Sequence, residues 1–348
     1  MRYGYFSEDS REYIITRPDT PRPWVNYLFN DSYHAIISQT AGGFSYCRDP
    51  KFNRIHRYER MLSDRPGRYL FLRDEKTMAT WSATWQPMMR RYQKFRAVHG
   101  LGYTSISSQY FDIATQLTFF VPPEDACEVC LVEITNRSTG YRELKLFPYI
   151  DFVAGDAQME IDYPNIMSLY NRAGYYSDLN AIIAYKQPHP TRQVESYAWF
   201  ATSEKVHGYD CSRETFLGRY GELVRPQMVL NGACTNSSAC GEDMIGLFEQ
   251  RVTLSPGEKA RFVLLTGFID NDQLPPLPAL QKDHETFLPF LPSPAGKEKI
   301  QAVISRYLAV EKAEETLQYV KNLWRGKTDT LVIETPDTDV DRMTNLWG

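Results

Sequence analysis

The strongest constraint on the fold is a two-residue alternation of apolar and polar side chains. In residues 111–119, every odd position is bulky or β-branched and three of the four even positions are polar. Successive side chains of a β-strand point to opposite faces, so this pattern predicts a strand that is buried on one face. Two more strand-like runs, 129–135 and 144–152, are joined by 136–140, a connection of hairpin length that ends in glycine.

The same order of strand, turn and strand recurs later in the chain. Residues 250–254 and 261–268 are strand-like, and the Ser-Pro-Gly-Glu sequence at 255–258 supplies the backbone angles of a turn. The 23 Tyr, 18 Phe and 21 Pro of the chain suit many strands joined by turns. Half-buried strands need a second sheet to cover their apolar faces. We therefore predict a mainly β fold in which residues 1–270 form a large antiparallel β-sandwich.

The sequence changes character twice near its end. Residues 271–296 contain six prolines, which prevent a strand ladder or a helix, so we predict a stiff connector. In residues 297–326, apolar side chains recur at spacings of three and four, with one break near Glu311 and a glycine at the end. This pattern predicts one kinked helix or two short ones with a single apolar stripe. A further amphipathic pattern begins within 327–348, and we expect it to lead into another domain.

Charge and hydropathy exclude two classes of partner. The net charge is -4, with 39 Lys and Arg against 43 Asp and Glu, so the chain lacks the positive surplus that nucleic-acid binding requires. The mean hydropathy is -0.45, and no run approaches the roughly 20 apolar residues that span a bilayer. We expect no nucleic acid and no membrane among the partners.

The six cysteines and the amino-terminal residues predict a cytoplasmic location. The cysteines are spread over 348 residues, and the first residues lack the apolar core of a secretory signal, so we expect free thiols in a reducing compartment. Cys127 and Cys130 have the spacing of a metal or redox pair, but a zinc site needs two more ligands. We interpret them as buried thiols on two sides of a strand. No two histidines are three or four residues apart, and no metal site is predicted.

Signatures of common catalytic sites are missing from the sequence. It contains no G-x-S-x-G, H-E-x-x-H, P-loop or G-x-G-x-x-G motif. A long polar segment, 155–176, follows the strand-like run 144–152, and long loops within β domains are often functional. Its aromatic rings, amides, carboxylates and guanidinium are the groups that cover the C–H face of a sugar and pair with its hydroxyls. The candidate sugar-binding residues are Asp156, Gln158, Asp162, Tyr170, Asn171 and Arg172. The alternative is a solvated excursion whose aromatic rings pack on the sandwich.

Several ordered motifs resemble one enzyme family. These motifs lie at residues 3–6, 11–28, 37–46, 65–69, 81–87, 99–104, 214–218 and 341–347. In this order they resemble the cellobiose and chitobiose phosphorylases of glycoside hydrolase family 94, and the resemblance covers nearly the whole sequence.

The resemblance implies a galactose-mutarotase-like supersandwich, then a helical linker, then an α-helical barrel that lies beyond residue 348. In such enzymes, which are glycosyltransferase-type phosphorylases, a carboxylic acid of the barrel protonates the glycosidic oxygen while inorganic phosphate attacks the anomeric carbon and inverts it. Phosphate replaces the activated water of an inverting hydrolase, so no second carboxylate is needed. The resemblance therefore implies no catalytic residue in this chain, no cofactor, and phosphate as co-substrate of the whole enzyme.

The resemblance also gives the sandwich a role. It implies that the sandwich packs on the barrel, supports a homodimer and brings the 155–176 segment, including Tyr170, Asn171 and Arg172, to the acceptor side of the active site. Cellobiose phosphorylases carry a Trp-Asn pair where this chain has Gly155-Asp156, which speaks against cellobiose as substrate. Chitobiose, a longer cellodextrin and other β-glucosides remain open as the β-linked disaccharide or oligosaccharide.

Three functional hypotheses follow. The first is the amino-terminal part of an inverting β-glycoside phosphorylase, inactive by itself. The second is a free-standing carbohydrate-binding or interaction module without catalysis. The third is one half of a split enzyme whose barrel is a separate polypeptide.

Overall fold

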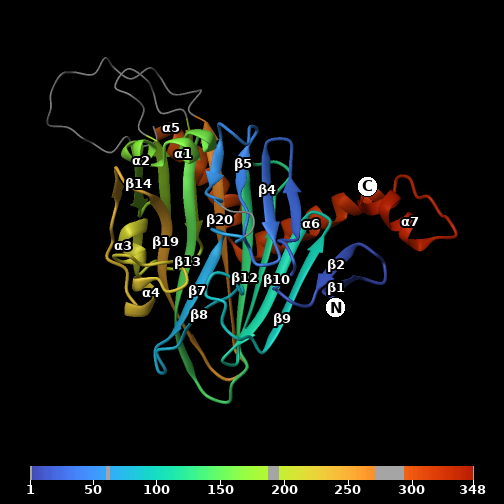
Figure 1. Cartoon of the computed structure of the whole chain (residues 1–348), viewed down its shortest axis with the longest axis horizontal. Coiled ribbons are helices and arrows are strands. Elements are labelled where there is room, and N and C mark those ends of the chain that lie inside the picture. The colour runs from blue at the N-terminus through green and yellow to red at the C-terminus, as the bar shows by residue number, and fades with distance from the viewer. Residues whose placement is uncertain (1, 60–62, 187–195, 271–293, 348) are drawn as a thin grey trace.

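Two large antiparallel sheets make up most of the fold (Figure 1). A computed structural model of the chain describes residues 2–59, 63–186, 196–270 and 294–347. Within these residues the first sheet has eleven strands. In spatial order they are β1 (Gly4–Phe6), β2 (Glu12–Ile15), β9 (Lys94–Gly100), β10 (Tyr103–Tyr110), β11 (Ile113–Phe120), β12 (Cys127–Asn136), β20 (Lys259–Asp270), β16 (Ser196–Thr202), β15 (Ala181–Lys186), β14 (Asn171–Tyr176) and β18 (Ala239–Cys240).

The second sheet has nine strands in the described residues and is centred on the 14-residue strand β13. Its main path is β17 (Gly208–Ser212), β19 (Met244–Leu254), β13 (Arg142–Gly155), β6 (Arg54–His56), β5 (Ser45–Cys47), β4 (Tyr33–Ser38) and β3 (Val25–Phe29). The strand β7 (Tyr69–Asp74) pairs with the first half of β13, and β8 (Thr80–Ser82) pairs with β7.

The main core lies between the two sheets. It combines side chains from both of them, for example Leu28 and Leu146 of the second sheet with Ile106, Leu117 and Val132 of the first. All five are at most 1% exposed. The predicted mainly β sandwich is therefore confirmed, because each sheet buries one apolar face against the other.

The hairpin of β10 and β11 corrects the start of one predicted strand. Tyr110 pairs directly with Ile113, so Phe111 and Asp112 are the two residues of a tight turn. Their φ angles are +50° and +62°, as a two-residue hairpin turn with the native twist requires. The alternation of the sequence extends through this turn, which is why the strand was predicted from residue 111 rather than 113.

Two short helices cover the outer face of the second sheet. They are α3 (Arg213–Leu217) and α4 (Gln227–Asn231). Phe216 and Val229 of these helices are fully buried against Phe71, Phe147 and other outward side chains of the sheet.

The carboxyl-terminal helices cover the outer face of the eleven-stranded sheet. The helix α5 (Pro294–Tyr307) and the helix α6 (Val310–Thr328) bury the apolar stripe that the sequence predicted, including Ile300, Ile304 and Val320. Most of the predicted connector, 271–293, lies outside the described residues. Its last three residues already belong to α5, and proline is well tolerated in the first turn of a helix.

The last described residues lie beside the amino-terminal strands (Figure 1). A short helix, α7 (Thr338–Arg342), is followed by a single π-type turn, Met343–Trp347. Arg342 Nε donates to Ser10 Oγ at 2.8 Å, and Arg11 forms an ion pair with Asp329. The two ends of the described chain are therefore tied together.

The thiols of Cys127 and Cys130 lie on opposite faces of β12. Cys127 belongs to the cluster under α5 and α6, whereas Cys130 belongs to the core between the sheets. Both are buried free thiols, and burial raises the pKa of each. In the part of the chain that the structure describes, no helix is long and apolar enough to cross a membrane.

Among the described residues, the histidines His56 and His99 are buried and uncharged near pH 7. Neither ring nitrogen of His56 has a hydrogen-bond partner within the described residues, and burial lowers the pKa of this ring to about 3. The ring nitrogens of His99 lie 3.0 Å from Thr104 Oγ1 and 2.9 Å from the carbonyl oxygen of Trp24. Burial lowers the pKa of His99 to about 4.

Acid is therefore expected to destabilise the fold through these two rings. Unfolded histidines take up a proton at a pKa of about 6.5, whereas the folded rings stay neutral until the pH reaches their lowered pKa. The stabilisation is complete above pH 6.5 and is lost as the pH falls toward 4 and 3, by about 1.4 kcal/mol per pH unit for each ring. Urea unfolding at pH 7, 6 and 5 measures this slope. A His56→Phe variant with the slope of the parent chain would contradict the assignment.

Candidate functional site

The segment 155–176 is ordered secondary structure rather than the long loop that its polarity suggested. After β13 it forms α1 (Ala157–Asp162), α2 (Pro164–Met167) and the 3₁₀ turn Ser168–Tyr170. Residues 171–176 are the strand β14, which pairs with β15 and β18 at one edge of the eleven-stranded sheet. The segment therefore sits at the top of the sandwich in Figure 1, where β14 joins it to the sheet.

Three of the six candidate residues point to solvent. Gln158 and Asp162 are exposed on α1, where Gln158 Nε2 donates to Asp162 Oδ1 at 2.9 Å. Tyr170, at the end of the 3₁₀ turn, is 38% exposed. An aromatic ring, an amide and a carboxylate are thus available on one short stretch of surface.

The other three candidates support the segment. Asp156 caps α1, where its carboxylate accepts hydrogen bonds from the backbone N–H groups of Gln158 and Met159 at 2.9 and 3.0 Å. Asn171 is fully buried, so it does not contact a ligand at the surface. Arg172 Nη1 donates to the carbonyl oxygens of Leu169 and Asn171 at 3.0 and 2.7 Å. Asp156 and Asn171 can therefore position the 155–176 segment.

A buried network of charges anchors this segment to the second sheet. Arg57, which follows β6, lies at its centre and is 7% exposed. Its guanidinium is 3.3 Å from Asp151 Oδ1, 2.6 Å from Glu160 Oε1 and 3.0 Å from Asp243 Oδ2. Burial alone would lower the pKa of Arg57, but these three carboxylates outweigh it and raise the pKa. Glu160 belongs to α1, so the network holds the helix down.

Lys186 and Arg213 extend the network. Lys186 Nζ, on β15, donates to Glu160 Oε2 at 2.8 Å and to Asn171 Oδ1 at 2.7 Å. Burial lowers the pKa of Lys186 despite this ion pair. Arg213 Nε donates to Asp151 Oδ2 at 3.0 Å, and the charge of Asp151 raises the pKa of Arg213. Behind the candidate residues, the described side chains of Arg57, Lys186 and Arg213 therefore face the buried carboxylates of Asp151 and Glu160 and the more exposed ones of Asp243 and Glu59.

Most of this network leaves no pattern in the sequence. A detectable signal was Asp151, an ionisable residue between Ile150 and Phe152 in an apolar strand, because a buried charge needs a partner. Its partners Arg57 and Arg213 are 94 and 62 residues away along the chain, so local patterns do not reveal them.

The exposed side chains of the segment suit recognition rather than bond breaking. Apolar side chains just before Tyr170 in the sequence are also exposed: Tyr163 by 52%, Ile166 by 53% and Leu169 by 60%. Such groups can cover the C–H face of a sugar ring while Gln158 and Asp162 pair with its hydroxyls. Among the described residues, no group of three or more His, Cys, Asp and Glu side chains could hold a metal ion.

Comparisons with known proteins agree with this fold. The model of the "Glycosyl hydrolase 94, supersandwich domain" matches residues 11–307. Among solved structures, a putative kojibiose phosphorylase from the human microbiome matches 93% of this chain and 38% of its own, with a TM-score of 0.50 and 9% identity, which supports the fold alone.

Curated relatives are longer than this chain. An N,N'-diacetylchitobiose phosphorylase of Vibrio furnissii is 30% identical over 100% of this chain and 40% of its own length. A solabiose phosphorylase of Paenibacillus borealis is 29% identical over 99% of this chain and 42% of its own length. The chain therefore spans about two fifths of the curated relatives that it matches. The family predicted from the sequence motifs is confirmed, and the chain belongs to glycosyl hydrolase family 94, whose supersandwich domain it contains.

Proposed function

We propose that this chain is the amino-terminal supersandwich and linker of an inverting β-glycoside phosphorylase. In this role it supplies a scaffold for an α-helical barrel, a surface for a homodimer and part of the site for the acceptor sugar. The observation that carries the proposal is that relatives named as disaccharide phosphorylases align along the whole chain while extending well beyond it. The enzyme is proposed to be cytoplasmic and to need inorganic phosphate as co-substrate but no cofactor.

The division of labour in this proposal follows from the chemistry. An inverting phosphorylase needs one acid to protonate the leaving oxygen, and phosphate itself is the nucleophile. Two of the three carboxylates of the 155–176 segment are committed elsewhere, because Asp156 caps a helix and Glu160 is neutralised by Arg57 and Lys186, and the third, that of Asp162, accepts a hydrogen bond from Gln158. The acid and the phosphate site are therefore assigned to the barrel, and this chain orients the sugar that receives the proton.

Joining the chain to a barrel tests the proposal. The partner is the part of the Vibrio furnissii phosphorylase that this chain does not match, and the assay follows sugar 1-phosphate formed from inorganic phosphate and β-linked disaccharides. A folded, joined protein is expected to release sugar 1-phosphate only when phosphate is present. A joined protein that is folded by circular dichroism but cleaves none of the disaccharides would contradict the proposal. Sedimentation of the same protein tests the homodimer.

Tyr170 is expected to contribute to acceptor binding. In the joined enzyme, Tyr170→Ala should raise the KM for the disaccharide about tenfold and leave kcat within about twofold, because a sugar-facing ring contributes about 1–1.5 kcal/mol of binding. The matched control is Tyr220→Ala, since Tyr220 is 93% exposed and precedes α4 on the other sheet. Equal KM values for the two variants would remove Tyr170 from the acceptor site.

A free-standing carbohydrate-binding module is the second candidate function. It is favoured by the exposed aromatic rings of Tyr163 and Tyr170. Titration of the 348-residue chain with cello- and chito-oligosaccharides separates the two candidates. Saturable binding that Tyr170→Ala abolishes supports the module, whereas no binding supports a scaffold that depends on its barrel.

A further inference from the structure

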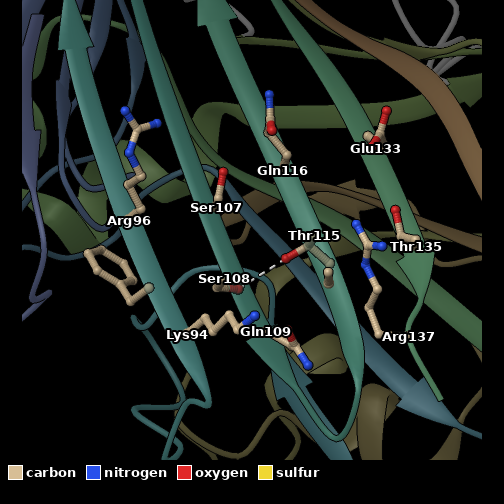
Figure 2. A pocket seen from close by; sticks show the side chains of 12 residues that line it. Lys94, Arg96, Ser107, Ser108, Gln109, Thr115, Gln116, Glu133, Thr135 and Arg137 are labelled. Atoms are coloured by element: carbon tan, nitrogen blue, oxygen red, sulfur yellow. Dashed lines mark hydrogen bonds between the residues drawn. The ribbon is translucent and has the colours of Figure 1, made fainter.

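A polar hollow lies on the outer face of the eleven-stranded sheet, away from the 155–176 segment. It has a volume of about 850 Å³ and spans β9, β10, β11 and β12 (Figure 2). Three strands, β20, β16 and β15, separate β12 from β14, the strand that ends the candidate acceptor segment. The volume is in the usual range for a small-molecule site.

The strand register explains the shape of the hollow. One row of outward side chains runs across the four strands as Arg96, Ser107, Gln116 and Glu133. In this row, Ser107 of β10 and Gln116 of β11 lie between Arg96 of β9 and Glu133 of β12. Four neighbouring strands cover about 14 Å, a span comparable with a disaccharide.

A second row, two residues along each strand, completes the lining. It contains Lys94, Gln109, Ala114 and Thr135 in register, with Arg137 just beyond it. Figure 2 shows Lys94 and Arg96 on one side of the hollow and Arg137 on the opposite side, with amide and hydroxyl groups between them. The short side chain of Ala114 leaves the centre of this row open.

The charge of the hollow is positive although the whole chain has a net charge of -4. Lys94, Arg96 and Arg137 are exposed, and none of them forms a salt bridge within the described residues. The one carboxylate in the lining, that of Glu133, is neutralised by Lys259, whose Nζ lies 2.8 Å from Glu133 Oε1. Three unpaired cations around one small hollow favour an anion.

The remaining lining specifies the rest of the ligand. Ser107, Gln109, Gln116 and Thr135 offer hydroxyls and amides that can pair with sugar hydroxyls. Phe95 is the one aromatic side chain in the lining and is only 9% exposed, so no ring is available to stack on a nucleobase. From this arrangement, we propose that the hollow binds an anionic saccharide, a sugar that carries a carboxylate or a phosphate group.

The proposal does not depend on the phosphorylase assignment, so it is tested on the 348-residue chain itself. Isothermal titration calorimetry measures binding of a glucuronate-containing disaccharide and of glucose 1-phosphate, which separate the two sources of charge. Cellobiose and inorganic phosphate are the neutral and the sugar-free probes. At least one anionic saccharide is expected to bind more tightly than both of these probes, and higher salt should weaken the binding because exposed charges are screened.

Variants locate the binding site. The double variant Arg96→Gln/Arg137→Gln is expected to weaken binding of the anionic saccharide at least tenfold, because two charge-assisted contacts are lost. The matched control is Arg225→Gln, since Arg225 is an exposed arginine just before α4 on the other sheet. Glu133→Gln removes the one negative charge and should tighten binding about threefold, a gain that a misfolded variant would not show.

The following outcomes would overturn the proposal. They are no binding of either anionic saccharide, binding no tighter than that of cellobiose or inorganic phosphate, and unchanged affinity in the Arg96→Gln/Arg137→Gln variant. Self-association of the chain that the double variant abolishes, without any saccharide binding, would assign the hollow to a second copy instead.

Discussion

Replacing Arg57 with methionine is expected to lower the free energy of unfolding by about 3–5 kcal/mol. Within the described residues, Arg57 is the one cation that contacts Asp151, Glu160 and Asp243 together, and Asp151 is only 1% exposed. Without the guanidinium, Asp151 keeps only Arg213 as a cationic partner and Glu160 keeps only Lys186. Removing one member of a buried ion pair leaves an uncompensated charge, which costs far more than the pair contributes as a whole.

Denaturant unfolding measures this loss against a matched control. Arg11→Met removes the ion pair with Asp329, whose side chains are 25% and 48% exposed, and should cost less than about 1 kcal/mol. Arg57→Lys keeps the charge but not the planar guanidinium. Its loss of unfolding free energy should therefore lie between those of Arg57→Met and Arg11→Met. A loss below about 1 kcal/mol for Arg57→Met would show that the network does not hold the 155–176 segment in place.

The second large effect is expected between the sheets. Arg68 Nε donates to Glu128 Oε1 and its Nη2 donates to Glu128 Oε2 at 2.9 Å, and each side chain is 4% exposed. Burial alone would raise the pKa of Glu128, but the charge and hydrogen bonds of Arg68 outweigh it and hold the pKa below its ordinary value. Arg68→Met should therefore lower the free energy of unfolding by about 3–5 kcal/mol, because Glu128 is left charged in the core.

Removing both charges should restore most of this stability. The double variant Arg68→Met/Glu128→Leu removes both charges of this pair from the core, and such apolar replacements are often neutral overall. A thermodynamic cycle from guanidinium unfolding of the two single variants and the double variant measures the coupling. If the double variant loses as much unfolding free energy as the two single variants together, the two side chains are not coupled.

The sheets were predictable because their signals are local. The alternation of apolar and polar side chains in residues 113–119 predicts a strand with one buried face. This strand is β11, which buries Ile113 and Leu117 on that face. The turn at Phe111 and Asp112 was missed because its residues continue the alternation, whereas the pairing of Tyr110 with Ile113 depends on the partner strand. The spacing of Ile300, Ile304 and Val320 predicted an apolar stripe, but not that the eleven-stranded sheet would bury it.

The candidate site was only partly predictable because composition does not report burial. Tyr170, Gln158 and Asp162 were selected for their chemistry and do lie at the surface. Asn171 was selected in the same way, but it is fully buried. It lies in β14, which pairs with β15, and its side chain accepts a hydrogen bond from Lys186 Nζ. Contacts of this kind join residues that are far apart in sequence, so they become visible only once the strands are placed.

We propose that this chain supports a phosphorylase without performing its chemistry. The most direct test is the amount of sugar 1-phosphate that the 348-residue chain alone forms from β-linked disaccharides and inorganic phosphate. We expect none above the background without protein, at enzyme concentrations where the chain joined to a barrel is active. Phosphate-dependent release by the chain alone, retained through gel filtration as a single species, would contradict it.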